Sequence, residues 1–158
     1  MRTLKLQPSE KQWKFLTDTH RHVAYGGARG GGKSWAVDVK AMALALKYAG
    51  IKILLVRRTL GELKKNHVGP LLKMLNGIAR YNQTDKTFYF PNGSTITLGY
   101  CDNDNDVLQY QGAEYDVIFF DEAAQLLESW IRDINVTVRG VNSFPKRTYY
   151  TLNPGGPS

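Results

Sequence analysis

Cysteine and long apolar runs are scarce in this 158-residue chain, and each scarcity excludes a class of protein. The single cysteine, Cys101, rules out an internal disulfide framework, and the three histidines with this cysteine show no zinc-site spacing. The longest apolar runs, 41–46 and 117–120, fall far short of the ~20 residues that a membrane span requires. Residues 1–7 also lack the apolar core of a secretion signal. We therefore expect a soluble protein of a reducing compartment.

Low-complexity tracts, repeats and linkers are absent as well, so nothing divides residues 1–158 into separate domains. The charge is unbalanced, because 21 Lys and Arg residues against 14 Asp and Glu give a net charge of +7. Such a surplus suits a polyanionic partner, although many folded domains of similar charge bind none. The composition therefore predicts one domain and leaves the partner open.

The first third of the chain has the pattern of a βαβ unit. A brief strand is expected over 22–25, and it ends in a glycine-rich segment. From Lys33 to Tyr48 apolar residues lie nearly all round the predicted helix, which indicates packing on several faces, and Gly50 provides its stop. The apolar run 51–56 then predicts a strand buried on both faces. This order of elements is typical of parallel strands joined by a crossover helix.

The rest of the chain adds further strands and helices. A capping box, Thr59 with Glu62, predicts a helix, and an Asn-Gly turn between the runs 87–90 and 95–98 predicts a hairpin. Strands are expected over 115–120 and 148–152. Helical spacing between these two strands is shown by Leu127, Ile131, Ile134 and Val138. The predicted fold class is α/β, a mostly parallel sheet flanked by helices, with one inserted antiparallel hairpin.

A phosphate loop follows the first predicted strand, because segment 27–34 matches the pattern Gly-x4-Gly-Lys-Ser in full. Glycines let backbone N–H groups converge on phosphate oxygens, and the N-terminus of the next helix favours their negative charge. The lysine reaches the terminal phosphates, and the serine hydroxyl ligates Mg²⁺. A glycine-rich turn with a chance Lys-Ser is the alternative, but the strand before and the helix after favour a nucleotide site. The predicted nucleotide-binding residues of this loop are Gly27, Ala28, Arg29, Gly30, Gly31, Gly32, Lys33 and Ser34.

Two adjacent acids, Asp121 and Glu122, end the apolar run 117–120. A carboxylate at this edge of the sheet can hold Mg²⁺, and the next one can polarise a water aimed at the γ-phosphate. An ordinary strand that ends in solvated acids is the alternative. The paired glutamate favours a P-loop NTPase of the ASCE, RecA-like type over GTPases and small-molecule kinases. The guanine-reading pattern Asn-Lys-x-Asp is also missing from the chain.

Two further polar positions have open roles. Asn153, in the segment Thr151-Leu-Asn153-Pro154, follows the last predicted strand, where it could sense the γ-phosphate or belong to a plain turn. Gln12 lies upstream of the phosphate loop, and its amide could pair with adenine. It also stands three residues after Ser9, the spacing of a capping box in which its amide satisfies the backbone.

Two other patterns carry less chemistry. The acidic run 102–106 fails as a calcium loop, because Val107 replaces the required glycine and Ala113 the bidentate glutamate. The doublet Arg57-Arg58 at a strand end could face phosphate or DNA, or form an exposed basic edge.

Taken together, these motifs resemble the ATPase domain of the large terminase subunit of tailed bacteriophages, the motor that packages viral DNA into a capsid. The resemblance covers nearly the whole chain. Its most particular features are an arginine inside the phosphate loop, the Gln-Gly-x-x-Tyr-Asp segment before the paired acids, and the closing Thr-x-Asn-Pro. The segments that carry it are Gln12, 27–34, 55–59, 111–123 and 151–154.

The resemblance implies a role for each site residue. Lys33 and Ser34 bind the β/γ-phosphates of ATP and Mg²⁺, Asp121 completes the metal site, and Glu122 activates water. Gln12 belongs to an adenine motif. A coupling motif that links hydrolysis to movement includes Thr151 and Asn153.

The resemblance also implies partners and a location. They are double-stranded DNA, a capsid portal, a small terminase subunit and further copies of the chain in a ring, in the cytoplasm of a bacterial host. Because the sequence ends at Ser158, directly after the coupling motif, we expect it to lack the family's nuclease domain and part of the ATPase sheet. Rival interpretations are another P-loop ATPase, such as a helicase or recombinase core, and a nucleotide-binding assembly fragment with little turnover.

Two arginines are candidates for stabilising the transferred phosphoryl group. Arg29 lies inside the phosphate loop and could act within its own subunit. Arg139, predicted to end the helix after the paired acids, could act on the neighbouring subunit of a ring. The alternative for Arg139 is a basic residue that interacts with the C-terminus of its helix.

Overall fold

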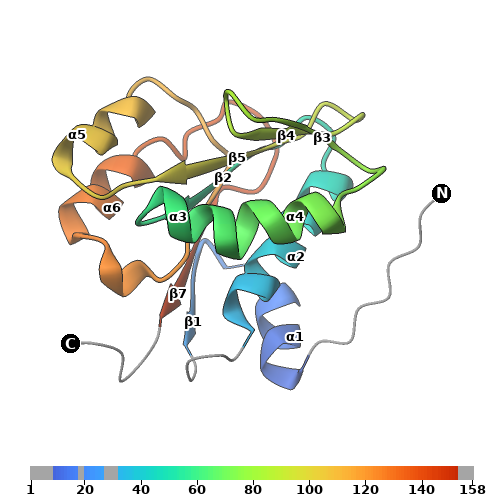
Figure 1. Ribbon diagram of the computed structural model, residues 1–158, viewed down its shortest axis with the longest axis horizontal. Coiled ribbons are helices and arrows are strands. Elements are labelled where there is room, and N and C mark those ends of the chain that lie inside the picture. Colours follow the sequence, from blue (N-terminus) through green and yellow to red (C-terminus); the bar gives the residue numbers. More distant parts are fainter. Residues whose placement is uncertain (1–8, 18–19, 27–31, 153–158) are drawn as a thin grey trace.

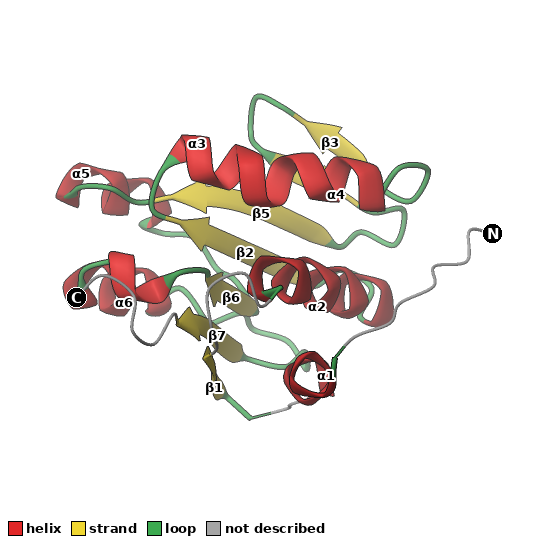
Figure 2. Cartoon of the chain, turned by 60° about the horizontal axis from the view of Figure 1, so that its bottom comes forward, coloured by secondary structure: helices red, strands yellow, loops and turns green. Residues whose placement is uncertain are grey.

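A single mixed sheet forms the centre of the molecule (Figure 1). The structure, a computed structural model, describes residues 9–17, 20–26 and 32–152. In chain order the described strands are β1 (His22–Gly26), β2 (Lys52–Arg57), β3 (Arg80–Asn82), β4 (Thr87–Tyr89), β5 (Thr95–Tyr100), β6 (Val117–Phe120) and β7 (Arg147–Leu152). Their order across the sheet is β1-β7-β6-β2-β5-β4-β3, which Figure 2 shows from bottom to top.

The sheet is parallel over five strands and antiparallel at one edge. Strands β1, β7, β6, β2 and β5 pair in parallel, and β4 and β3 continue the sheet in antiparallel pairing. The α/β fold class is therefore confirmed. The hairpin of β4 and β5 also forms, but it is part of the sheet rather than an insertion, since β5 pairs with β2 along its full length.

Helices cover both faces of this sheet. They are α1 (Glu10–Thr17), α2 (Lys33–Lys47), α3 (Leu60–Leu63), η1 (Lys64–Val68), α4 (Gly69–Met74), α5 (Asp104–Val107), η2 (Leu108–Tyr110), η3 (Ala123–Gln125) and α6 (Glu128–Asn135). The elements α3, η1 and α4 form one continuous helix, green in Figure 1, whose middle turn η1 is π-helical. Within the described ranges, no helix has both the length and the apolar character to cross a bilayer.

Two sequence predictions about local structure meet different outcomes. The cap at Thr59 is confirmed, because the Glu62 backbone N–H donates to the Thr59 hydroxyl at 3.2 Å and α3 begins there, while the Glu62 side chain bonds Arg57. The helix predicted to reach Val138 instead ends at Asn135. Val138 forms a parallel bridge with Tyr115 and is buried in the core beneath α5, η2 and α6.

Strand alternation divides the buried side chains into two cores. On β2, Ile53 and Leu55 belong to the core beneath α1, α2, α3 and α4, whereas Leu54 and Val56 belong to the core beneath α5, η2 and α6. Successive residues of a strand point to opposite faces, so a continuous apolar run fills both cores. This explains why the central strands consist almost entirely of apolar residues.

We predict that Phe119→Ala lowers the free energy of unfolding by about 3–5 kcal/mol. Phe119 is fully buried and stacks on Tyr149, with ring centroids 4.7 Å apart, at the centre of the sheet. Urea denaturation measures the change, and Leu108→Ala is the control, because Leu108 is 54% exposed and should change stability by only about 0.5 kcal/mol. Equal losses in the two variants would contradict this account of the core.

Candidate nucleotide and metal site

The carboxyl ends of neighbouring parallel strands bring the candidate site together. Arg57 ends β2, Asp121 directly follows β6, and Thr151 lies near the end of β7. Because β7, β6 and β2 are adjacent and parallel, these three side chains share one edge of the sheet. Ligands of open α/β sheets bind at this edge, outside the carboxyl ends of the strands.

Asp121 is the centre of the hydrogen bonding at this edge. Its Oδ2 atom accepts a hydrogen bond from the Ser34 hydroxyl at 2.8 Å and another from Arg57 Nη1 at 2.7 Å. Its Oδ1 atom accepts one from the Thr151 hydroxyl at 2.5 Å. The fold therefore brings together the two residues predicted to ligate a metal, Ser34 and Asp121, which are 87 residues apart.

The donor set of this edge suits magnesium rather than zinc. Hydroxyl and carboxylate oxygens are the hard ligands that Mg²⁺ prefers, and Mg²⁺ usually takes few protein ligands because it keeps several waters and binds substrate phosphates. Across the described residues, no group of three or more His, Cys, Asp and Glu side chains is arranged to hold a metal. The contact between Ser34 and Asp121 thus fits a metal that arrives with a nucleotide.

Glu122 adopts a backbone conformation that is rare outside glycine. Its φ is 54° and its ψ is 54°, in the left-handed region. Strained backbones of this kind cost energy and cluster at functional sites. The Glu122 backbone N–H donates to the Thr151 hydroxyl at 2.8 Å, while that hydroxyl donates to Asp121. Thr151 therefore contacts the Asp121 carboxylate and the Glu122 backbone at once.

The described end of the phosphate loop lies at the N-terminus of α2. Lys33 is buried there, and Gly32 precedes the helix with a φ of 75°. The left-handed conformation favours glycine here, and a Cβ atom on Gly32 would lie 2.3 Å from Gln12 Nε2 and displace that flexible amide. The remaining predicted site residues, Gly27, Ala28, Arg29, Gly30, Gly31 and Asn153, lie outside the described residues.

The capping interpretation of Gln12 is confirmed. The Ser9 backbone N–H donates to Gln12 Oε1 at 2.8 Å, and the Gln12 backbone N–H donates to the Ser9 hydroxyl at 3.2 Å. The same side chain also donates from Nε2 to the Gly32 carbonyl at 3.3 Å. The cap therefore holds Gln12 against the phosphate loop, and its role toward adenine stays a prediction.

The arginine doublet has one residue in the site and one outside it. Arg57 is buried and contacts Asp121, and its Nε donates to Glu62 at 3.3 Å. Arg58 is exposed and pairs with Asp102 at 3.1 Å. Adjacent residues at the end of a strand point to opposite sides, so alternation along β2 was a usable signal for this difference.

Two further site residues, His67 and Asp38, were missed by the sequence analysis. His67 Nε2 lies 2.6 Å from Asp121 Oδ2, and its Nδ1 lies 2.5 Å from Asp38 Oδ1. Both side chains are fully buried. Asp38 had a weak signal as an acid within an otherwise apolar stretch of α2, but nothing around His67 in the sequence distinguished it.

The charges of this cluster shift one another's pKa values. Burial by itself lowers the pKa of His67, but the charge of Asp38 and the hydrogen bonds to Asp121 and Asp38 outweigh burial and raise this pKa to about 9. Burial raises the pKa of Asp38 to about 6, against the attraction of His67. Burial also acts to raise the pKa of Asp121, yet His67, Thr151 and Arg57 together hold it well below its usual range.

Arg139 lies at the amino ends of the parallel strands, the opposite end of the sheet from Asp121. Its backbone N–H donates to the Tyr115 carbonyl at 3.2 Å, just before β6 begins, whereas Asp121 follows the end of β6. Asp121 lies six residues after Tyr115, which is about 20 Å of extended chain. Arg139 also lies beyond the end of α6, so the prediction that it ends this helix is wrong.

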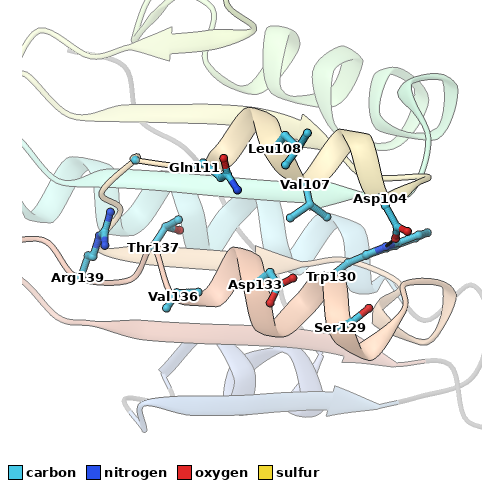
Figure 3. Close-up of a pocket in the computed structure, with 11 residues that line it drawn as sticks. Asp104, Val107, Leu108, Gln111, Ser129, Trp130, Asp133, Val136, Thr137 and Arg139 are labelled. Carbon is cyan, nitrogen blue, oxygen red and sulfur yellow. Dashed lines mark hydrogen bonds between the residues drawn. The ribbon is translucent and has the colours of Figure 1, made fainter.

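The exposed side chain of Arg139 borders a groove between α5, η2 and α6. The groove has a volume of about 470 Å³ and includes neither Ser34 nor Asp121 in its lining. Figure 3 shows Arg139 at one end of it, with Ser129 and Trp130 at the other end. Arg139 therefore cannot reach a nucleotide bound at the Asp121 edge of its own subunit.

Solved structures of similar fold are phage terminases. The large terminase from a thermophilic bacteriophage has a TM-score of 0.78 at 20% identity, covering 93% of this chain and 39% of that one. The large terminase ATPase domain of Thermus phage P74-26 has a TM-score of 0.71 at 18% identity, covering 92% and 64%. The HK97 bacteriophage large terminase has a TM-score of 0.72 at 14% identity, covering 94% and 33%. This chain thus spans about two fifths of the first of these proteins. No curated protein sequence matches it.

The parallel sheet, the phosphate-loop helix and the acid at the strand end define the chain as a P-loop NTPase fold. A family model described as "Terminase large subunit, T4likevirus-type, N-terminal" matches residues 24–154. The chain belongs to this terminase family, as the sequence motifs predicted.

We predict that the metal-free and nucleotide-free protein loses stability between about pH 6.5 and 9 through His67. The folded-state pKa of His67 is raised from 6.5 to about 9, so its stabilisation is full below 6.5 and is lost as the pH rises through 9. The pKa of Asp38 is also raised, but its change with pH is complete near pH 6, and the stabilisation from Asp121, whose pKa is lowered, is full above pH 3.8 and so stays constant over this range. Urea denaturation of the parent and of D38N/H67Q across this range measures the effect. An equally steep fall in both proteins would contradict it.

Proposed function

We propose that this chain is the ATP-hydrolysing motor domain of a DNA-packaging terminase. The observation that carries the proposal is the hydrogen bond between Ser34, at the start of the phosphate-loop helix, and Asp121, with Glu122 directly beside it. Family membership supports the proposal, as do the similar folds of the thermophilic bacteriophage's large terminase in complex with ATP-gamma-S and with ADP.

Each described side chain has a role in this proposal. Lys33, at the N-terminus of α2, binds the terminal phosphates, and the Gln12 amide, next to Gly32, binds adenine. Ser34 and Asp121 hold Mg²⁺, which neutralises charge on the transferred phosphoryl group. Glu122 accepts a proton from the attacking water. Thr151 keeps Asp121 and Glu122 in place, and with Asn153 it couples hydrolysis to movement.

The proposed partners follow from the family. Double-stranded DNA is the substrate that is moved, and the net charge of +7 is consistent with a polyanion. A capsid portal, a small terminase subunit and further copies of the chain in a ring complete the proposed assembly, in the cytoplasm of a bacterial host. The left-handed backbone at Glu122 is consistent with a functional position beside Asp121.

We predict that Lys33→Ala and Glu122→Gln separate nucleotide binding from hydrolysis. Lys33→Ala should weaken both, because the lysine contacts the phosphates in the ground state and in the transition state. Glu122→Gln should keep ATP binding and lower the turnover rate by about 10²–10⁴-fold, since it removes only water activation. Calorimetric ATP titration and steady-state phosphate release measure the two effects. Hydrolysis by Glu122→Gln at the parental rate would show that the base lies elsewhere.

We further predict that Arg139 acts on a neighbouring subunit. Its position at the opposite edge of the sheet excludes action on its own site, and an arginine at the transferred phosphoryl group is worth about 10³–10⁵-fold in rate. Arg139→Ala and Glu122→Gln should each be nearly inactive alone. When they are mixed under conditions of ring assembly, activity should partly return. A Glu122→Gln subunit still supplies Arg139 to the site of a neighbouring Arg139→Ala subunit, and that site retains Glu122.

The matched control is Arg132→Ala, which removes an exposed arginine of α6, and which should keep activity without mixing. Absence of recovery despite proven co-assembly would return the role to Arg29.

A further inference from the structure

A buried pair behind the candidate metal ligand is not used by any role assigned above. His67 lies between Asp38 and Asp121, at 2.5 and 2.6 Å from one oxygen of each. All three side chains are at most 1% exposed. The three residues come from α2, the π-helical turn η1 and the end of β6, so the contact joins separate parts of the fold.

The geometry makes His67 a donor on both sides. An ionised carboxylate can only accept hydrogen bonds, and a carboxylate oxygen faces each ring nitrogen. The ring therefore cannot rotate or swap partners without losing a bond to one of the two acids. Asp38 holds one side of the ring, and the other side is thereby aimed at Asp121.

The Asp121 carboxylate is in turn fixed in its plane. His67 approaches the same Oδ2 atom that accepts from Ser34, while Thr151 holds Oδ1. Arg57 also reaches Oδ2, but it shares its guanidinium with Glu62. Among these donors, the His67 ring is the one that is itself held by a second buried acid.

Stability alone is a poor explanation for this cluster. Buried ionic groups are often replaced by apolar ones without loss of stability, because the cost of desolvation offsets their attraction. Within the part of the chain that the structure describes, the second oxygen of Asp38 is buried without a hydrogen-bond partner, a further cost. His67 also lies on a π-helical turn, an irregularity that is frequent at functional sites.

We propose that Asp38 and His67 position the Asp121 carboxylate for magnesium, so that His67 is a positioning residue of the nucleotide complex. The proposal rests on the proposed function, in which Ser34 and Asp121 hold the metal. Partners that orient metal-binding groups in this way typically change metal affinity by about 10- to 100-fold when they are removed.

Two double variants test the proposal. D38L/H67L removes the hydrogen bond to Asp121 and leaves no unpaired charge at either position. D38N/H67Q removes the charges but allows the asparagine amide to bond the glutamine oxygen and the glutamine amide to bond Asp121. The matched control is Val68→Ala, a truncation in the same helical turn at a partly buried residue that packs in the apolar core.

The measurement is calorimetric binding of ADP in excess Mg²⁺ and in EDTA, together with thermal unfolding of each protein. The gain in ADP affinity from Mg²⁺ should fall by about 10- to 100-fold in D38L/H67L and stay near the parental value in D38N/H67Q and Val68→Ala. Affinity for ADP in EDTA should be equal in all of them, which a general loss of structure would not allow.

Each other outcome overturns the proposal. An unchanged Mg²⁺ gain in folded D38L/H67L, or an equal loss in D38N/H67Q or Val68→Ala, would show that the pair does not position Asp121. If D38L/H67L does not fold, D38L/H67M replaces it, because methionine adapts to irregular space. Failure of both to fold would make the pair a requirement of folding instead. A parent that binds no ADP would refute the proposed function itself, whereas a parent with a normal Mg²⁺ gain keeps that function whatever the variants do.

Discussion

The carboxylate of Asp121 accepts hydrogen bonds from four parts of the fold: α2 through Ser34, β2 through Arg57, η1 through His67 and β7 through Thr151. A buried carboxylate is stable only if its charge is compensated, so each of these elements must stand at one position relative to the end of β6. The arrangement of the sheet edge is therefore dictated by a single side chain. Misplacement of a donor would weaken this compensation in the interior.

The same edge also explains why an apolar sheet can deliver polar chemistry. Strands β2 and β6 are buried almost throughout by two apolar cores, and polar side chains gather where β2, β6 and β7 end. Thr151 shows this transition, because it pairs with β1 in the sheet while its hydroxyl contacts Asp121 and the Glu122 backbone. The strands thus hold these polar groups in register at their carboxyl ends.

Local sequence patterns predicted much of the fold and of the site. The residues that these patterns missed are placed by contacts between segments that are distant in the sequence. The βαβ unit, the capping box at Thr59 and the acid at the end of β6 follow from spacing within a few residues. His67 could not be predicted, because its meaning depends on acids 29 and 54 residues away and no motif surrounds it. Val138 was misassigned for a related reason, since its apolar character fitted a helix face as well as the bridge to Tyr115 that it forms.

The π-helical turn sets a constraint on chain length. Between the cap at Thr59 and the buried Leu71 and Leu75, the helix contains a wider turn than an α-helix, with His67 within it. A π-helical turn closes its hydrogen bonds from residue i to i+5, one residue more than in an α-helix, so it holds an extra residue in about one rotation of the helix. The helix after this turn therefore keeps Leu71 and Leu75 in the core, while His67 lies within the wide turn against Asp121. The spacing between the cap and the second half of this helix is consequently as much a part of the site as the side chains themselves.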